Sequence, residues 1–157
     1  MSGSDAHPYI DKTHPATYKA LVGMLKEVRA ANKAAGLEPT LTELVNLRAS
    51  QLNGCVACMS VHATQARRVG VEQLKLDILP GWRESREFSP QERAALGLVE
   101  ALTRPRPEEA GAVTPQAAGA HARKHFTDTQ VAALEWTIIT INAFNRVSII
   151  SEHPVVR

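Results

Sequence analysis

The sequence is poor in cysteine and aromatic residues, and neither sign of charge dominates it. Its 157 residues contain two cysteines, 4% aromatic residues and a formal net charge of +2. Two closely spaced cysteines cannot cross-link a chain of this size, which excludes a disulfide-stabilised scaffold. Because the net charge is small and the basic residues form no long run, the composition argues against nucleic-acid binding.

Long hydrophobic stretches are also missing. No apolar run approaches the roughly 18 residues that a membrane-spanning helix requires. The segment 1–8 lacks the basic and apolar regions of a signal peptide. We therefore expect a cytoplasmic protein that does not act at a membrane, and its hydrophobic share of 44% and charged share of 22% are typical of a globular domain.

The hydrophobic periodicity predicts an all-α fold with about seven helices and no convincing strand. Residues 1–15 are polar and contain two prolines, so we expect a flexible arm there, followed by a single domain over residues 16–157. Proline-containing loops are expected at 80–88 and 104–113. The expected helices cover 16–35, 40–53, 55–69, 71–78, 89–104, 114–125 and 128–150.

The two cysteines form a Cys55-Val-Ala-Cys58 motif, and His62 follows four residues later. Side chains three or four residues apart lie on one face of a helix, with Cα atoms about 5 Å apart, which is close enough for a disulfide. A helix N-terminus favours a thiolate at Cys55, whereas His62 can take the proton of Cys58 or stabilise its thiolate. The spacing therefore indicates a redox-active dithiol, in which the helix N-terminus favours Cys55 as the more reactive thiol and the offset of His62 favours Cys58.

Glu43 has two interpretations. A turn after its helix could bring its carboxylate towards the thiols and complete a Glu–His–dithiol group, or Glu43 could close a capping box with Thr40. Glu43, Cys55, Cys58 and His62 could also be written as a zinc site. A structural zinc site usually has a second Cys/His pair, which this chain lacks, so we predict no metal and no other cofactor.

The remaining histidines and aromatic residues show no comparable spacing, and we predict packing or surface roles for them. For the aromatic residues, these roles are core or subunit contacts rather than ligand stacking. The residues concerned are His7, His14, His121, His125, His153, Trp82, Trp136 and Phe144.

The four residues match the pattern Glu-x11-Cys-x2-Cys-x3-His, and on this motif the chain resembles the AhpD-like alkylhydroperoxidases of the carboxymuconolactone decarboxylase superfamily. The surrounding sequence agrees, including Trp82-Arg83-Glu84 and Asn145-Arg146, and the resemblance spans roughly residues 15–150. It implies an AhpD-like helical bundle that assembles as a homotrimer or homohexamer.

The resemblance also implies thiol-dependent reduction of a hydroperoxide substrate. By position, Cys58 would attack the peroxide, Cys55 would resolve the intermediate, and Glu43 and His62 would relay protons. An external dithiol of the lipoyl or thioredoxin type would then reduce the disulfide. AhpD has a histidine immediately before its second cysteine, where this chain has Ala57, so we expect a simpler relay and a weaker peroxidase.

Two other functions remain open on the sequence. Lactone decarboxylation, the reaction that names the superfamily, needs no dithiol, and the paired cysteines count against it. A non-catalytic redox sensor or binding module would use the same disulfide without peroxide turnover.

Overall fold

The computed structural model describes residues 7–106 and 108–157, and every regular element within these ranges is a helix. This confirms the all-α prediction. None of the described helices is both long enough and apolar enough to span a bilayer. In chain order the elements are α1 (Ile10–Thr13), α2 (Pro15–Ala34), α3 (Pro39–Asn53), α4 (Val56–Arg68), α5 (Gln73–Ile78), the 3₁₀-helix η1 (Leu79–Glu84), α6 (Pro90–Thr103), α7 (Pro115–Ala122) and α8 (Asp128–Ile150).

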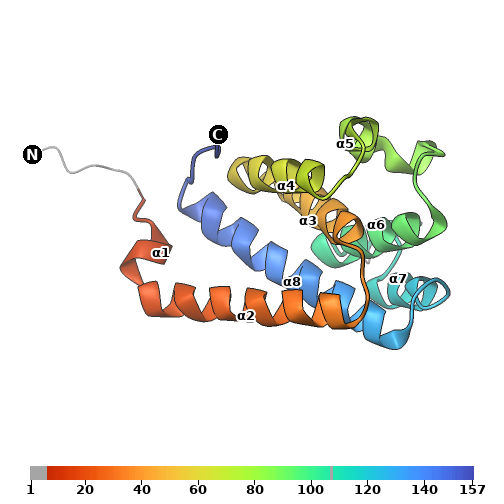
Figure 1. Cartoon of the computed structure of the whole chain (residues 1–157), viewed down its shortest axis with the longest axis horizontal. Coiled ribbons are helices and arrows are strands. Elements are labelled where there is room, and N and C mark those ends of the chain that lie inside the picture. Colours follow the sequence, from red (N-terminus) through yellow and green to blue (C-terminus); the bar gives the residue numbers. More distant parts are fainter. Residues whose placement is uncertain (1–6, 107) are drawn as a thin grey trace, which may run out of the picture.

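Helix α3 lies at the centre of the arrangement and packs against α4, α6 and α8. The long helices α2 and α8 contact each other, and α2 forms one side of the molecule (Figure 1). The chain after α8 returns towards α4, where the Val156 amide donates a hydrogen bond of 3.0 Å to Ser60 Oγ. Both ends of the described chain therefore lie near the space between α2, α4 and α8.

The core is built from aliphatic residues on the facing sides of α3, α6 and α8. These helices contribute fully buried side chains, and burying each such side chain is worth roughly 1.5–3 kcal/mol. The apolar stripes that predicted these helices therefore face one another. Among these side chains are Leu44, Val45, Leu96, Leu98, Leu134 and Ile138.

The predicted arm over residues 1–15 needs correction at its C-terminal end. Residues Ile10–Thr13 form α1, and Pro15 is already the first residue of α2. The Ile10 amide donates to Ser151 Oγ at 3.2 Å, so the C-terminal end of α8 holds this segment. No local sequence pattern could reveal this contact, because the partner lies 141 residues away. Residues 1–6 of the predicted arm lie outside the described residues.

Of the two interpretations of Glu43, the structure does not have the capping box with Thr40. Helix α3 begins one residue earlier, at Pro39, and its N-cap is Glu38, which makes no side-chain capping bond. Proline suits the first helical position because its fixed φ matches the helix and its missing N–H is not needed there. The side chain of Glu43 is thus free of a capping role.

Local signals located the later helices more accurately. Capping boxes are present at Ser89 with Glu92 and at Thr127 with Gln130, and Thr114 caps α7. The expected loop over 80–88 is partly ordered, because η1 covers residues 79–84.

Candidate functional site

The dithiol lies at a sharp turn between α3 and α4. Gly54 ends α3 with φ = 70°, a left-handed conformation that glycine adopts without steric cost. Cys55 is the N-cap of α4, and its sulfur accepts a hydrogen bond from the Cys58 amide at 3.3 Å. The two Cα atoms are 5.3 Å apart, and the Sγ atoms are joined in a disulfide. Helix α4 therefore presents both sulfurs at its first turn.

A network of amide side chains anchors this turn to α8. Asn53 Nδ2 donates to Asn142 Oδ1 and to Asn145 Oδ1, both at 2.9 Å. Asn145 is fully buried and donates in turn to Ser50 Oγ at 3.1 Å. Arg146 binds the carbonyl and side-chain oxygens of Asn142. The late Asn145-Arg146 pair therefore supports the turn that carries Cys55.

The packing of α3 against α4 brings Glu43 and His62 together. His62 Nδ1 lies 2.8 Å from Glu43 Oε2, and the two side chains are only 14% and 15% exposed. Because a carboxylate can only accept, the imidazole donates its Nδ1–H, which leaves Nε2 as the acceptor in the neutral ring. The carboxylate therefore fixes both the orientation and the tautomer of the histidine.

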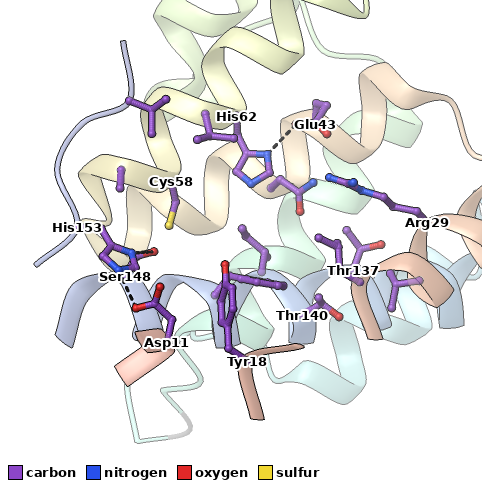
Figure 2. Close-up of a pocket in the computed structure, with 18 of the residues that line it drawn as sticks. Asp11, Tyr18, Arg29, Glu43, Cys58, His62, Thr137, Thr140, Ser148 and His153 are labelled. Atoms are coloured by element: carbon purple, nitrogen blue, oxygen red, sulfur yellow. Dashed lines mark hydrogen bonds and ion pairs between the residues drawn. The ribbon is translucent and has the colours of Figure 1, made fainter. Parts of the chain in front are cut away.

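A cavity of about 560 Å³ opens beside this pair, between α2, α4 and α8. Glu43, Cys58 and His62 all line it, whereas Cys55 is buried and does not. Figure 2 shows the Cys58 sulfur and the His62 ring directed into the same space. Much of the remaining wall is apolar, with side chains from Leu25, Val28, Ala57, Val61, Ile141, Phe144, Val155 and Val156.

The cavity also includes residues to which the sequence analysis gave no site role. His153 lines it and connects two distant segments, because its Nε2–H donates to Asp11 Oδ1 and its Nδ1 is hydrogen-bonded to Ser148 Oγ, both at 3.2 Å. Burial raises the pKa of Asp11, but the hydrogen bond and charge of His153 and the charge of Lys12 together bring that pKa below its ordinary value. The partners lie 142 residues apart, so no local spacing could have revealed them.

The aromatic residues differ in where they lie. Trp82 is buried in the core, as predicted, and Trp136 is 52% exposed. Phe144 lines the cavity and packs edge-on against Tyr18, with ring centroids 6.1 Å apart. Phe144 is therefore placed to contact a ligand, which its sequence context did not indicate.

The zinc arrangement considered from the sequence is not assembled. Glu43 and His62 pair with each other, and the two cysteines are bonded together. Within residues 7–106 and 108–157, no group of three or more His, Cys, Asp or Glu side chains is arranged to hold a metal ion.

A second charged cluster surrounds Glu100, outside the cavity. One carboxylate oxygen accepts from Arg48 and from Trp82 Nε1, both at 2.9 Å, and the other accepts from Arg83 at 2.7 Å. Burial raises the pKa of Glu100, but these hydrogen bonds outweigh it and bring the pKa below its ordinary value. Trp82 and Arg83, which belong to the motif noted in the sequence, therefore serve this cluster.

Comparison with known proteins identifies the family to which the chain belongs. The model of the carboxymuconolactone decarboxylase family matches residues 15–101, a range that includes Glu43, both cysteines and His62. The uncharacterized protein YdfG of Bacillus subtilis (strain 168) is 31% identical over 126 residues, which cover 80% of this chain and 83% of that protein.

Solved structures agree on the fold. The crystal structure of an Agrobacterium tumefaciens protein of unknown function, suggested to be the antioxidant defence protein AhpD, has a TM-score of 0.82. It is 29% identical, over 98% of this chain and 99% of that one. The debrominase Bmp8 has a TM-score of 0.76 at 18% identity, over 92% of this chain and 74% of its own, and shows similarity of fold alone. The chain therefore has the AhpD-like helical fold and belongs to the carboxymuconolactone decarboxylase family.

Proposed function

We propose that the protein is a thiol-dependent peroxidase that reduces hydroperoxides through Cys55 and Cys58. The observation that carries this proposal is the different placement of the two sulfurs. Cys58 lines the cavity together with His62, whereas Cys55 is buried behind it. A substrate in the cavity would meet Cys58 first, and Cys55 is within bonding reach of whatever forms there.

In the first step, the reduced Cys58 gives its proton to His62 Nε2 and attacks the outer oxygen of the hydroperoxide. The O–O bond breaks, Cys58 becomes a sulfenic acid, and the other oxygen leaves as an alkoxide that takes a proton to become an alcohol. Glu43 stabilises the imidazolium that forms transiently. The Glu43–His62 pair thus supplies a base for the thiol and an acid for the leaving group.

In the second step, the Cys55 thiol attacks the sulfenic sulfur, forms the disulfide and releases water. An external dithiol of the lipoyl or thioredoxin type then reduces the disulfide through a mixed disulfide. In sum, a hydroperoxide and a dithiol become an alcohol, water and a disulfide. Because Ala57 lines the cavity where AhpD has a histidine, only one imidazole stands beside Cys58 on α4, and we expect slower turnover than in AhpD.

The test is hydroperoxide consumption by the purified protein with dihydrolipoamide as the dithiol, using cumene hydroperoxide as the probe. Wild type should turn over, and Cys58→Ser should consume none. Cys55→Ser should react once and accumulate a sulfenic acid on Cys58 that dimedone traps, identified by intact mass. Sulfenic acid trapped on Cys55 in Cys58→Ser, with wild-type first-step kinetics, would reverse the assignment. Disulfide formation without turnover would indicate a redox sensor instead.

We also propose that the active protein is a homotrimer or homohexamer with α8 in its contacts. Trp136 and Ile139 lie three residues apart on α8 and are 52% and 48% exposed, so together they form an apolar surface that another copy of the chain could cover. Light scattering at micromolar concentration should give a multiple of the chain mass, and Trp136→Glu should lower it. A monomeric mass for the wild type would contradict this proposal.

A further inference from the structure

Most of the charged side chains that line the cavity have, among the described residues, a partner of opposite charge or a hydrogen bond, but one does not. Asp11 is hydrogen-bonded to His153 and lies 3.5 Å from Lys12 Nζ, and Glu43 is hydrogen-bonded to His62. Arg29 also lines the cavity, from α2. Its guanidinium has no ion pair or hydrogen bond with any residue in the described ranges. Arg29 is therefore the cavity's one cation that the described residues leave without a counter-charge.

Arg29 is directed towards the reactive groups. Figure 2 shows its side chain extending from α2 towards the side of the cavity where Glu43 and His62 lie, with Cys58 on the other side of the His62 ring. A ligand anchored at Arg29 would thus extend past the imidazole to the sulfur. The group that can bind an anionic part of a ligand, Arg29, therefore lies apart from the reactive groups, His62 and Cys58.

Two polar side chains on the wall between these two points, Thr137 and Thr140, already have hydrogen-bond partners within the protein. Thr137 Oγ1 accepts a hydrogen bond from Asn32 Nδ2 and donates to the carbonyl of Ala133, and Thr140 donates to the carbonyl of Trp136. These polar groups are therefore satisfied within the protein, and their neighbours Val28, Ile141 and Phe144 are apolar. A volume of about 560 Å³ is in the usual range for a small organic ligand and far exceeds the need of hydrogen peroxide.

We propose that the preferred substrate is an apolar organic hydroperoxide that carries a carboxylate, and that Arg29 binds this carboxylate. This inference rests on the peroxidase function proposed above. The planar guanidinium can hold a carboxylate through two parallel hydrogen bonds, which fixes the orientation as well as the position of the substrate. The apolar body lies against α2 and α8, and the peroxide group lies at Cys58 and His62.

The kinetic test uses two probes of nearly equal shape, cumene hydroperoxide with a para-carboxylate and the methyl ester of that compound. Wild type should show a higher kcat/KM for the acid. Arg29→Ala should lower kcat/KM for the acid by about tenfold and leave the ester unchanged, and Arg29→Lys should recover part of the loss. Lys26→Ala is the matched control, because Lys26 is an exposed cation on α2 that does not line the cavity. Lys26→Ala should leave kcat/KM unchanged for both the acid and the ester. Equal losses of kcat/KM for the acid and the ester in Arg29→Ala would overturn the proposal.

A binding test is independent of peroxide chemistry. Para-isopropylbenzoate, which cannot oxidise a thiol, should bind to the disulfide form of the wild type in a calorimetric titration and about tenfold more weakly to Arg29→Ala. Equal affinity in the two proteins would refute carboxylate recognition by Arg29. If no hydroperoxide is reduced by the wild type, the peroxidase function fails, and this titration still decides the role of Arg29.

Discussion

Glu43 and Glu100 both come from helices that pack in the centre of the molecule, and both are paired with basic side chains, but their surroundings differ. Both oxygens of Glu100 are occupied, by two arginines and an indole, and the cluster lies outside the cavity that contains Cys58. Among the residues that the structure describes, the Glu43 side chain makes a single hydrogen bond, to His62, and that pair lines the cavity. The partners of Glu100 are arginines that keep their charge, whereas the partner of Glu43 is an imidazole, which can both accept and donate a proton.

This difference separates a structural role from a chemical one. Arginine does not give up its proton under ordinary conditions, so the Glu100 cluster can hold η1 against α3 and α6 but cannot move a proton. Histidine can both accept and donate, and the carboxylate behind it sets which nitrogen does so. Substitution of Glu100 should therefore change mainly the stability of the protein, and substitution of Glu43 should change mainly the reaction rate.

The largest expected effect is on stability, at Glu100. Glu100→Ala removes the acceptor of Arg48 Nε and Nη2 and of Trp82 Nε1, and should lower the free energy of unfolding by about 3 kcal/mol. Urea unfolding followed by circular dichroism measures this. Glu109→Ala is the control, because its partner Arg106 and Glu109 itself are about half exposed, and it should cost less than about 0.5 kcal/mol. A similar loss of unfolding free energy in both variants would contradict a structural role for Glu100.

The next effect is on rate, at His62. His62→Ala should slow the first oxidation of Cys58 by about 100-fold, while the free energy of unfolding changes by less than about 1 kcal/mol. The rate should recover as pH rises, because thiolate then forms without a base. Stopped-flow measurement with cumene hydroperoxide tests this, and His121→Ala is the control because His121 is an exposed residue of α7. A pH-independent loss would indicate that His62 acts in some other way.

A smaller effect is expected at Glu43. Glu43→Gln can still accept the Nδ1–H of His62 but no longer stabilises the imidazolium, so the first oxidation should slow by about tenfold with stability unchanged. Glu38→Gln on the same helix is the control, since Glu38 is exposed and makes no capping bond. Wild-type kinetics in Glu43→Gln would exclude the carboxylate from the relay.

The smallest effect is in the pH dependence of stability. Burial raises the pKa of Glu100, but the hydrogen bonds from Trp82, Arg83 and Arg48 lower the pKa by more than burial raises it. The pKa of Glu100 in the folded protein is therefore below the ordinary 4.5. The folded state then binds fewer protons, and this contribution is present above about pH 4.5 and lost as pH falls through the folded value. The stability difference between wild type and Glu100→Gln should be constant from pH 8 to pH 6 and shrink below pH 4.5. A constant difference down to pH 3 would contradict this linkage.

Much of the fold was predictable because its signals are local. Ser89 with Glu92 and Thr127 with Gln130 are three residues apart, and the structure has both capping boxes. The turn at Gly54 was also expected, since few residues other than glycine adopt a positive φ there. The start of α3 was misplaced because Thr40 suggests an N-cap, whereas Pro39 already occupies the first turn.

The candidate site was only partly predictable. The spacing of Cys55, Cys58 and His62 places them on one helix, and the structure pairs the two sulfurs. The partnership of Asp11 with His153 depends on chain segments 142 residues apart, and no helical periodicity encodes it. Arg29 lies among the exposed charges of α2 and resembles any solvated cation until the cavity is seen.

The anchoring of Asn53 by α8 has a consequence for how the protein is made. Asn142 and Asn145 follow Asn53 by 89 and 92 residues, and a ribosome makes the chain from its N-terminus. Both cysteines are therefore synthesised well before the side chains that hold their turn in place. A nascent chain that ends before α8 contains the complete Glu–Cys–Cys–His motif but lacks these anchors. Helix α8, which is translated after α3 and α4, thus completes the support of the dithiol.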